Sequence, residues 1–181
     1  MATVATSWVA RNLGSKMNIG FGNHHFIMIQ PGGFAMPGGI EIKNAGGTDF
    51  LTLGAFNSDE GNMVFEANNE SDVGAATEIL TGSGLGRFLN PFDWGAQKHE
   101  VTPPHQGVAV FAVEVVQRAL NYKRNTDSTP LKYTLSDDNC ASWVNTLFKV
   151  VGVSAAERKR LGQFWGVDWA EQLEIPDHLF N

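Results

Sequence analysis

Hydrophobic and polar positions change their period about half-way along the chain. In the first half, short apolar runs are separated by turns that contain glycine and proline, which is typical of β-strands. In the second half, apolar residues recur at spacings of three and four, which is typical of amphipathic helices. Strands followed by helices predict an α+β fold. With 181 residues, 43% of them hydrophobic, the chain is the right size for one domain, so we expect residues 1–181 to form a single unit.

Four segments of the first half are predicted strands, at residues 24–30, 40–43, 49–56 and 62–67. A polar turn at residues 57–61 predicts a hairpin between the last two. Residues 74–104 show no clear period, and their glycine-rich stretch at 82–86 matches neither a dinucleotide-binding fingerprint nor a P-loop. We interpret this stretch and the Gly/Pro-rich segment 31–39 as loops, which either border the functional site and influence its specificity or only connect strands.

The second half contains three predicted helices. An apolar stripe runs from Val108 to Tyr122, and a second helical pattern starts near Cys140 and ends at Gly152. A third, short and charged helix starts after Ser154, which has capping-box spacing to the glutamate three residues later. We expect the aromatic tail at residues 165–180 to pack back onto the domain.

Cys140 is the only cysteine of the chain and follows a run of helix-capping residues. Asp138 or Asn139 is a suitable N-cap, which places Cys140 in the first turn of its helix. There, the backbone N–H groups and the helix dipole favour a thiolate. Asp137 and Asp138 oppose it, because nearby carboxylates raise the pKa of a thiol. Cys140 is therefore either a nucleophile with a histidine as counter-charge or a small buried side chain.

His24 and His25 stand at the start of the first predicted strand. Adjacent strand residues point to opposite faces, so one of the two can face a cleft. A histidine at a strand end that faces a cysteine at a helix start forms a thiol–imidazole pair; alternatively, both are ordinary strand residues. The other histidines lack metal-ligand spacing, and we expect neither a metal site nor a cofactor. These are His99, His105 and His178.

The net charge of -6 argues against nucleic acid or an anionic membrane as a partner. A single cysteine excludes an internal disulfide. The first eight residues lack the basic region and apolar core of a signal peptide, and no apolar run reaches membrane-spanning length. We therefore expect synthesis in the cytoplasm without a signal peptide and no membrane insertion. Action outside the cell would require a signal-independent secretion system.

The element order resembles that of the circularly permuted papain-like proteins, the NlpC-related superfamily that includes the lecithin:retinol acyltransferase group. A histidine strand comes first, and Asn139-Cys140, followed by Trp143, comes later. The permuted branch commonly has a His-x-Phe strand, which His24-His25-Phe26 matches and which favours His24 as the base. The resemblance covers about residues 20–150. It implies an antiparallel sheet packed against the later helix that carries the cysteine.

The resemblance implies a cysteine peptidase or amidase in which Cys140 attacks a peptide-type bond after a histidine has taken the thiol proton. It also implies bacterial cell-wall peptide as the substrate. By analogy, the protein would be a secreted antibacterial effector with an immunity or carrier protein as a partner. A third polar residue should orient the imidazole, and Thr52 and Asp49 are candidates. The glutamine that papain-like enzymes often place shortly before the cysteine is missing between residues 130 and 140.

Two alternatives keep this fold and change the function. A lipid acyltransferase, a thioesterase or a protein deamidase would use the same nucleophile on another substrate. A non-catalytic binding module would leave Cys140 with a structural role, and this hypothesis would be favoured if neither histidine reached the sulfur.

Overall fold

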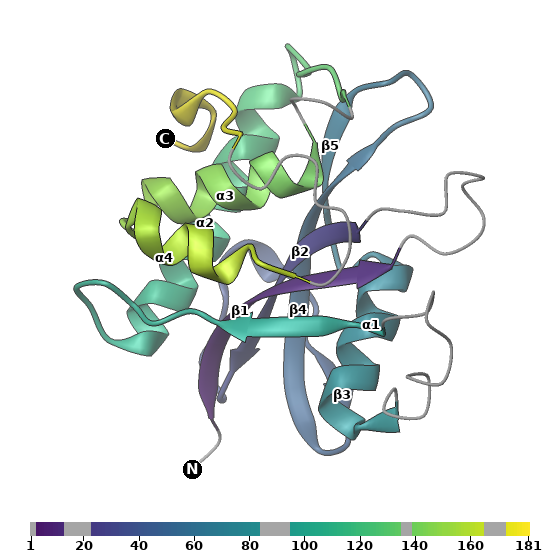
Figure 1. Cartoon of the computed structure of the whole chain (residues 1–181), viewed down its shortest axis with the longest axis vertical. Helices are drawn as coiled ribbons and strands as arrows, with labels where there is room; N and C mark the ends of the chain where they lie inside the picture. Colours follow the sequence, from purple (N-terminus) through teal and green to yellow (C-terminus); the bar gives the residue numbers. More distant parts are fainter. Residues whose placement is uncertain (1–2, 13–22, 84–94, 135–138, 165–172) are drawn as a thin grey trace.

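An antiparallel sheet of six strands forms the middle of the molecule (Figure 1). The computed structural model describes residues 3–12, 23–83, 95–134, 139–164 and 173–181. The strands lie in the order β3-β4-β2-β1-β6, and β5 also pairs with β4. They are β1 (Val4–Asn12), β2 (Asn23–Pro31), β3 (Lys43–Ala45), β4 (Thr48–Asn57), β5 (Met63–Ala67) and β6 (Gln97–Glu100).

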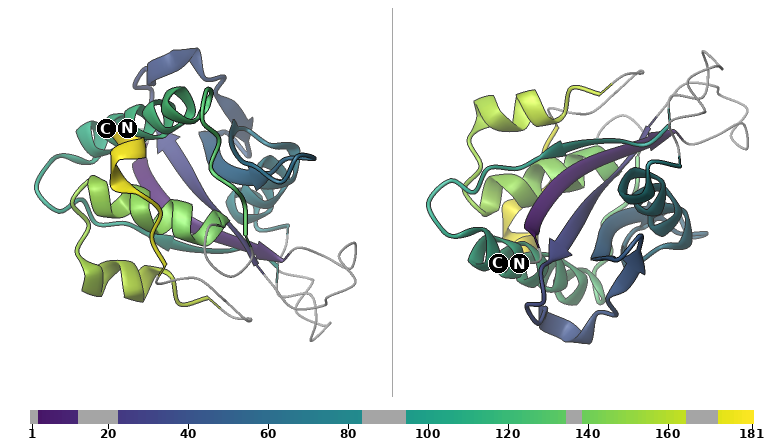
Figure 2. Two further views of the ribbon diagram at one scale, coloured as in Figure 1. Left: turned by 90° about the horizontal axis from the view of Figure 1, so that it is seen from above. Right: turned by 90° about the horizontal axis from the view of Figure 1, so that it is seen from below.

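Helices cover both faces of the sheet (Figure 2). They are α1 (Glu70–Thr81), α2 (Val108–Thr126), α3 (Cys140–Val150) and α4 (Ala155–Leu161), with 3-10 turns η1 (Pro37–Gly39) and η3 (Asp177–Phe180). A large hydrophobic cluster joins α2 and α3 to one face, and a smaller cluster joins α1 to the other. The predicted α+β class is confirmed.

Side-chain alternation along β2 separates the two histidines. Ile27 belongs to the cluster beneath α2 and α3, and Phe26 belongs to the cluster beneath α1. Because successive strand residues point to opposite faces, His25 points toward α2 and α3, and His24 points toward α1. The expected division of the histidines between the two faces is confirmed.

Two of the remaining predicted strands are confirmed, and one is displaced. Residues 49–56 and 62–67 correspond to β4 and β5, and their turn is closed by a 2.9 Å hydrogen bond from the Ser58 N–H to the Asn62 carbonyl. The strand expected at residues 40–43 begins only at Lys43. Gly46 and Gly47 connect this strand, β3, to β4, and their φ angles of 57° and 81° suit a two-residue hairpin turn.

Three elements, β1, α1 and β6, were not predicted from the sequence. The buried positions of β1 include Thr6 and Ser7, and those of α1 are Asp72, Ala75 and Ala76. These small or polar side chains give a weak hydrophobic period, although tertiary packing buries them. Strand β6 has only four residues, too few for a period to be evident.

The three predicted helices are confirmed. Helix α2 begins at Val108 and continues four residues beyond Tyr122 to Thr126, whose hydroxyl donates to the Tyr122 carbonyl at 2.9 Å. Helix α4 follows the Ser154 cap, whose hydroxyl accepts the N–H of Glu157 at 3.2 Å.

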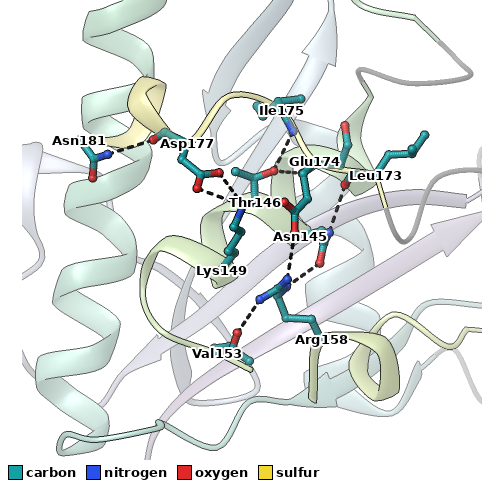
Figure 3. Close-up of polar contacts among 11 residues, drawn as sticks. Asn145, Thr146, Lys149, Val153, Arg158, Leu173, Glu174, Ile175, Asp177 and Asn181 are labelled. Atoms are coloured by element: carbon teal, nitrogen blue, oxygen red, sulfur yellow. Dashed lines mark hydrogen bonds and ion pairs between the residues drawn. The ribbon is translucent and has the colours of Figure 1, made fainter. Parts of the chain in front are cut away.

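The C-terminal segment 173–181 is held against α3 and α4 by hydrogen bonds and ion pairs (Figure 3). The Thr146 hydroxyl accepts the Ile175 N–H at 2.9 Å. The Glu174 carboxylate pairs with Lys149 at 2.6 Å and with Arg158 at 3.0 Å. These contacts connect the last residues of the chain to the helix that begins at the cysteine.

Phe180 anchors the same segment in the core. Its ring is fully buried, with its centroid 5.1 Å from that of Tyr122 and 5.9 Å from that of Trp143. The expectation that the aromatic tail packs back onto the domain is confirmed for residues 173–180. The rest of that predicted tail, residues 165–172, lies outside the described residues.

The Gly/Pro-rich segment 31–39 does not border the two histidines. It follows the end of β2, whereas His24 is near the start, and seven strand residues span about 23 Å. Its turn η1 packs on α2, where a Cβ on Gly38 would lie 2.6 Å from the Leu120 side chain. Of the glycine-rich stretch 82–86, Gly82 ends α1 in a left-handed conformation, and residues 84–86 lie outside the described ranges.

Candidate active site

Helix α3 begins at Cys140 because Asn139 caps it. The Asn139 side-chain oxygen accepts the N–H groups of Ala141 at 2.9 Å and of Ser142 at 3.1 Å. In return, the Ser142 hydroxyl accepts the Asn139 N–H at 2.8 Å. This reciprocal capping box holds the first turn. Of the two expected caps, Asn139 is confirmed, and Asp138 lies outside the described residues.

The Cys140 sulfur lies where two strands of the sheet separate. The ladder between β2 and β4 ends at the pair Phe26–Gly54 and does not reach His25, the residue that precedes Phe26. The backbone N–H of His25 instead donates to the Cys140 sulfur at 3.5 Å. The sulfur thus accepts the hydrogen bond that a carbonyl of a neighbouring strand would otherwise accept. Cys140 is buried, with 6% of its surface exposed.

His24 belongs to a row of four charged or ionisable side chains, which we call the charged row. Its ring Nε2 lies 3.3 Å from Oδ2 of Asp72 on α1. The other carboxylate oxygen, Oδ1, accepts the Arg11 Nε–H at 2.6 Å. The His24 imidazole also interacts with the Cys140 thiol. The row therefore runs Arg11, Asp72, His24, Cys140, with side chains from β1, α1, β2 and α3.

The histidine and the cysteine shift each other's protonation. Burial raises the pKa of the Cys140 thiol, but the His24 imidazolium outweighs it and, with a smaller effect from His25, lowers the pKa from 9.0 to about 6. Burial lowers the pKa of His24, but the Cys140 thiolate and the Asp72 carboxylate raise it from 6.5 to about 9. Between these two values, thiolate and imidazolium coexist as an ion pair.

The His25 ring has a different environment. Its Nδ1 accepts the indole N–H of Trp8 at 2.9 Å. The rings of Trp8 and Phe164 pack edge-on against it, with centroids at 5.9 and 5.4 Å. Of the two histidines, His24 therefore presents its ring to the thiol, while the His25 ring lies in the core and its backbone N–H contacts the sulfur.

Thr52 and Asp49, the expected partners of the imidazole, are both in the wrong place. Thr52 pairs with Met28, four residues along β2 from His24, a distance of about 13 Å. The Asp49 carboxylate accepts a hydrogen bond from Asn44 at 2.8 Å on the surface. The expectation assumed that the orienting residue comes from the adjacent strand, whereas it comes from a helix on the His24 face of the sheet.

Asp72 was missed in the sequence, although a signal for it exists. Asp72, Ala75, Ala76 and Ile79 follow the spacing of one helical face, and the first three are buried. An acidic residue in the apolar stripe of a helix is rarely buried without a partner. The sequence could therefore have identified Asp72 as a buried carboxylate. It could not have identified the residues that Asp72 contacts.

Gly54 and Phe56 shape the space around the His24–Asp72 contact. A Cβ on Gly54 would lie 3.0 Å from Oδ2 of Asp72 and 2.9 Å from the Phe56 ring. The Phe56 ring stacks on the imidazole, with centroids 4.5 Å apart and planes at 29°. Gly54 thus leaves room for the carboxylate, and Phe56 covers one face of the ring, where an aromatic face favours a cation.

Tyr133 is a second functional candidate that sequence reasoning missed. Its hydroxyl lies against both the thiol and the backbone N–H of Cys140, and burial, followed by the charge of Cys140, raises its pKa above the ordinary value. The hydroxyl therefore keeps its proton and acts as a donor beside the sulfur. It provides a side-chain donor near the cysteine in a chain that lacks the glutamine of papain-like enzymes.

Within the described parts of the chain, no group of three or more His, Cys, Asp or Glu side chains could hold a metal ion. In the same parts, no helix is both long enough and apolar enough to cross a membrane.

Comparison with known proteins gives no match to a family model, a curated protein or a solved structure. The resemblance to permuted papain-like proteins thus rests on the residue patterns and the order of the elements. The function is inferred from the geometry of the site.

Proposed function

We propose that the protein is a cysteine hydrolase in which Cys140 is the nucleophile and His24 is the general acid and base. The observation that carries the proposal is the buried contact of Cys140, His24 and Asp72. Burial opposes charge on both the thiol and the imidazole. A pair that remains ionised against this opposition is typical of a reactive site rather than of a structural cysteine.

The pair supports a two-step cleavage of a peptide-type amide. The Cys140 thiolate attacks the carbonyl carbon, and the His24 imidazolium gives its proton to the nitrogen as the C–N bond breaks. The free amine leaves, and the acyl group remains on sulfur as a thioester. His24 then takes a proton from water, whose oxygen attacks the thioester. The C–S bond breaks, and the carboxylic acid product leaves the thiolate as it was.

The developing oxyanion needs hydrogen-bond donors near the sulfur. We assign this role to the Tyr133 hydroxyl, which adjoins the thiol and keeps its proton. The N–H groups of Ala141 and Ser142 are engaged by the Asn139 cap. They are therefore less suited to hold the oxyanion.

The expected substrate is cell-wall peptide, because the element order resembles that of permuted papain-like proteins. On this proposal the protein is an antibacterial effector that is exported by a signal-independent system and has an immunity or carrier protein as a partner. A non-catalytic binding module is the weaker hypothesis. It would be favoured if neither histidine reached the Cys140 sulfur, but His24 interacts with that sulfur.

Purified sacculi test the proposal directly. The protein should release soluble fragments whose new peptide termini are detected by mass spectrometry. Cys140→Ser, which keeps the shape of the side chain, and His24→Gln should each lower the release at least about a hundredfold, because each removes a reacting group. Undiminished release by Cys140→Ser would refute the nucleophile. If the wild type released no fragments but transferred an acyl group from a lipid or deamidated a protein, the site would be assigned to that reaction instead.

A further inference from the structure

Arg11 and His24 face each other across the ladder between β1 and β2. Their Cα atoms are paired in the antiparallel register, so their side chains project from the same face, toward α1. Two cations directly opposite each other in a sheet repel. Asp72 lies between them and offers one carboxylate oxygen to each, Oδ1 to Arg11 and Oδ2 to His24.

We propose that Arg11 is a positioning residue that sets the pH range of the Cys140–His24 pair by balancing the charge of Asp72. The proposal rests on the proposed function only for the identity of the reacting pair. Along the charged row, the signs alternate from the Arg11 cation to the Cys140 thiolate. In the reactive state, the four charges sum to zero.

Charge balance matters here because the row is shielded from water. The Asp72 side chain is 1% exposed and the Arg11 side chain 17%, and charges interact strongly when solvent is excluded. Without Arg11, the row would carry a net negative charge. That charge would favour the protonated forms of both Cys140 and His24.

The other groups around the pair are few among the described residues. His24 faces Asp72 from α1 and Cys140 from α3, and the uncharged Phe56 ring covers it from β4. Cys140 also faces Tyr133 and the backbone N–H of His25, and the His25 imidazole has a smaller electrostatic effect on the thiol. Arg11 is the cation that contacts the Asp72 carboxylate on its oxygen Oδ1, which does not face His24.

The rate of Cys140 alkylation by iodoacetamide, followed from pH 4 to 10, tests the proposal without any substrate. In Arg11→Gln, both inflections of the profile should move to higher pH, by on the order of one pH unit for a charge lost at this range. Arg11→Lys keeps the charge and should stay near the wild-type profile. Thermal unfolding confirms that each variant is folded. An Arg11→Gln profile that coincides with the wild-type profile overturns the proposal.

A double variant separates charge balance from simple bracing of the strands. Asp72→Asn leaves the Arg11 cation unbalanced beside His24, so the alkaline inflection should move to lower pH. Adding Arg11→Gln to Asp72→Asn should move it back toward the wild type, although another contact has been removed. No return refutes charge balance. If the wild-type thiol titrates like an ordinary cysteine, the proposed function fails instead, so the two failures are distinguishable.

Discussion

At Gly54, the absence of a side chain leaves room for the contact between Asp72 and His24. The residue stands opposite Phe26 in the ladder between β4 and β2, at the last pair before the strands separate. The Asp72 carboxylate and the Phe56 ring both occupy the space that a side chain would fill. The orientation of His24 therefore depends on a residue that has no side chain of its own.

Gly54→Ala should slow both alkylation of Cys140 near neutral pH and turnover by at least about tenfold, because a displacement of the carboxylate by a fraction of an ångström disturbs its contact with His24. The added methyl group should also lower the free energy of unfolding by about 1–3 kcal/mol. Iodoacetamide kinetics and urea unfolding measure the two effects.

Gly74→Ala is the matched control, because it lies in α1, near Asp72 in sequence, and a Cβ there would meet nothing within 4 Å. It should leave the alkylation rate unchanged and raise the free energy of unfolding by about 0.5–1 kcal/mol. Equal alkylation rates for the two alanine variants would show that Gly54 has no special role.

At the scale of elements, α3 combines two functions. Its body is buried and carries Trp143, Leu147 and Phe148 into the core, while its first residue presents the thiol. The Asn139–Ser142 capping box joins these functions, because it determines the residue at which the helix begins. A start one residue later would rotate the cysteine out of the gap between β2 and β4.

Asn139→Ala should lower the free energy of unfolding by about 0.5–2 kcal/mol, as loss of an N-cap does. Because the cap also fixes the first turn, alkylation of Cys140 should become slower and its inflection near pH 6 less sharp. Ser154→Ala is the control: it removes the α4 cap and should have a similar effect on unfolding, with normal alkylation. Equal alkylation in both variants would contradict the link between the cap and the thiol.

At the scale of the whole molecule, the site exists because elements from both halves of the chain meet at the sheet. His25 and Cys140 are 115 residues apart in the sequence, yet they share a hydrogen bond. Helix α1 supplies Asp72, which contacts His24, and α3 supplies the thiol, which contacts the His25 N–H. Figure 2 shows these two helices on opposite faces of the sheet. The C-terminal segment then holds α3 in position through Phe180 and the contacts in Figure 3.

Phe180→Ala should lower the free energy of unfolding by about 3–5 kcal/mol, the usual effect of deleting a fully buried aromatic ring. The control is Phe34→Ala, because Phe34 is 54% exposed and its loss should change stability by less than about 0.5 kcal/mol. Urea unfolding followed by tryptophan fluorescence measures both. A loss below about 1 kcal/mol for Phe180→Ala would show that the C-terminal segment is not part of the core.

Elements with a strong hydrophobic period or a clear boundary signal were predictable from the sequence. The three helices of the second half, the hairpin of β4 and β5, and the helix start at Cys140 were all predicted, because local spacing and capping chemistry specify them. The opposite directions of His24 and His25 also follow from local geometry, since strand residues alternate. Helix α1 and strand β1 were missed, because α1 buries Asp72 and two alanines, and β1 buries Thr6 and Ser7 next to Trp8 and Val9, so neither shows a clear hydrophobic period.

The partners that meet at the site depend on tertiary packing. The family resemblance favoured His24 over His25, and the structure supplies the physical reason: Trp8 engages the His25 ring, and Asp72 contacts His24. The chain carries 19 acidic residues, and local pattern cannot tell which one lies beside an imidazole. That depends on strand register and on helix packing across the sheet, which are set by contacts between residues far apart in the sequence.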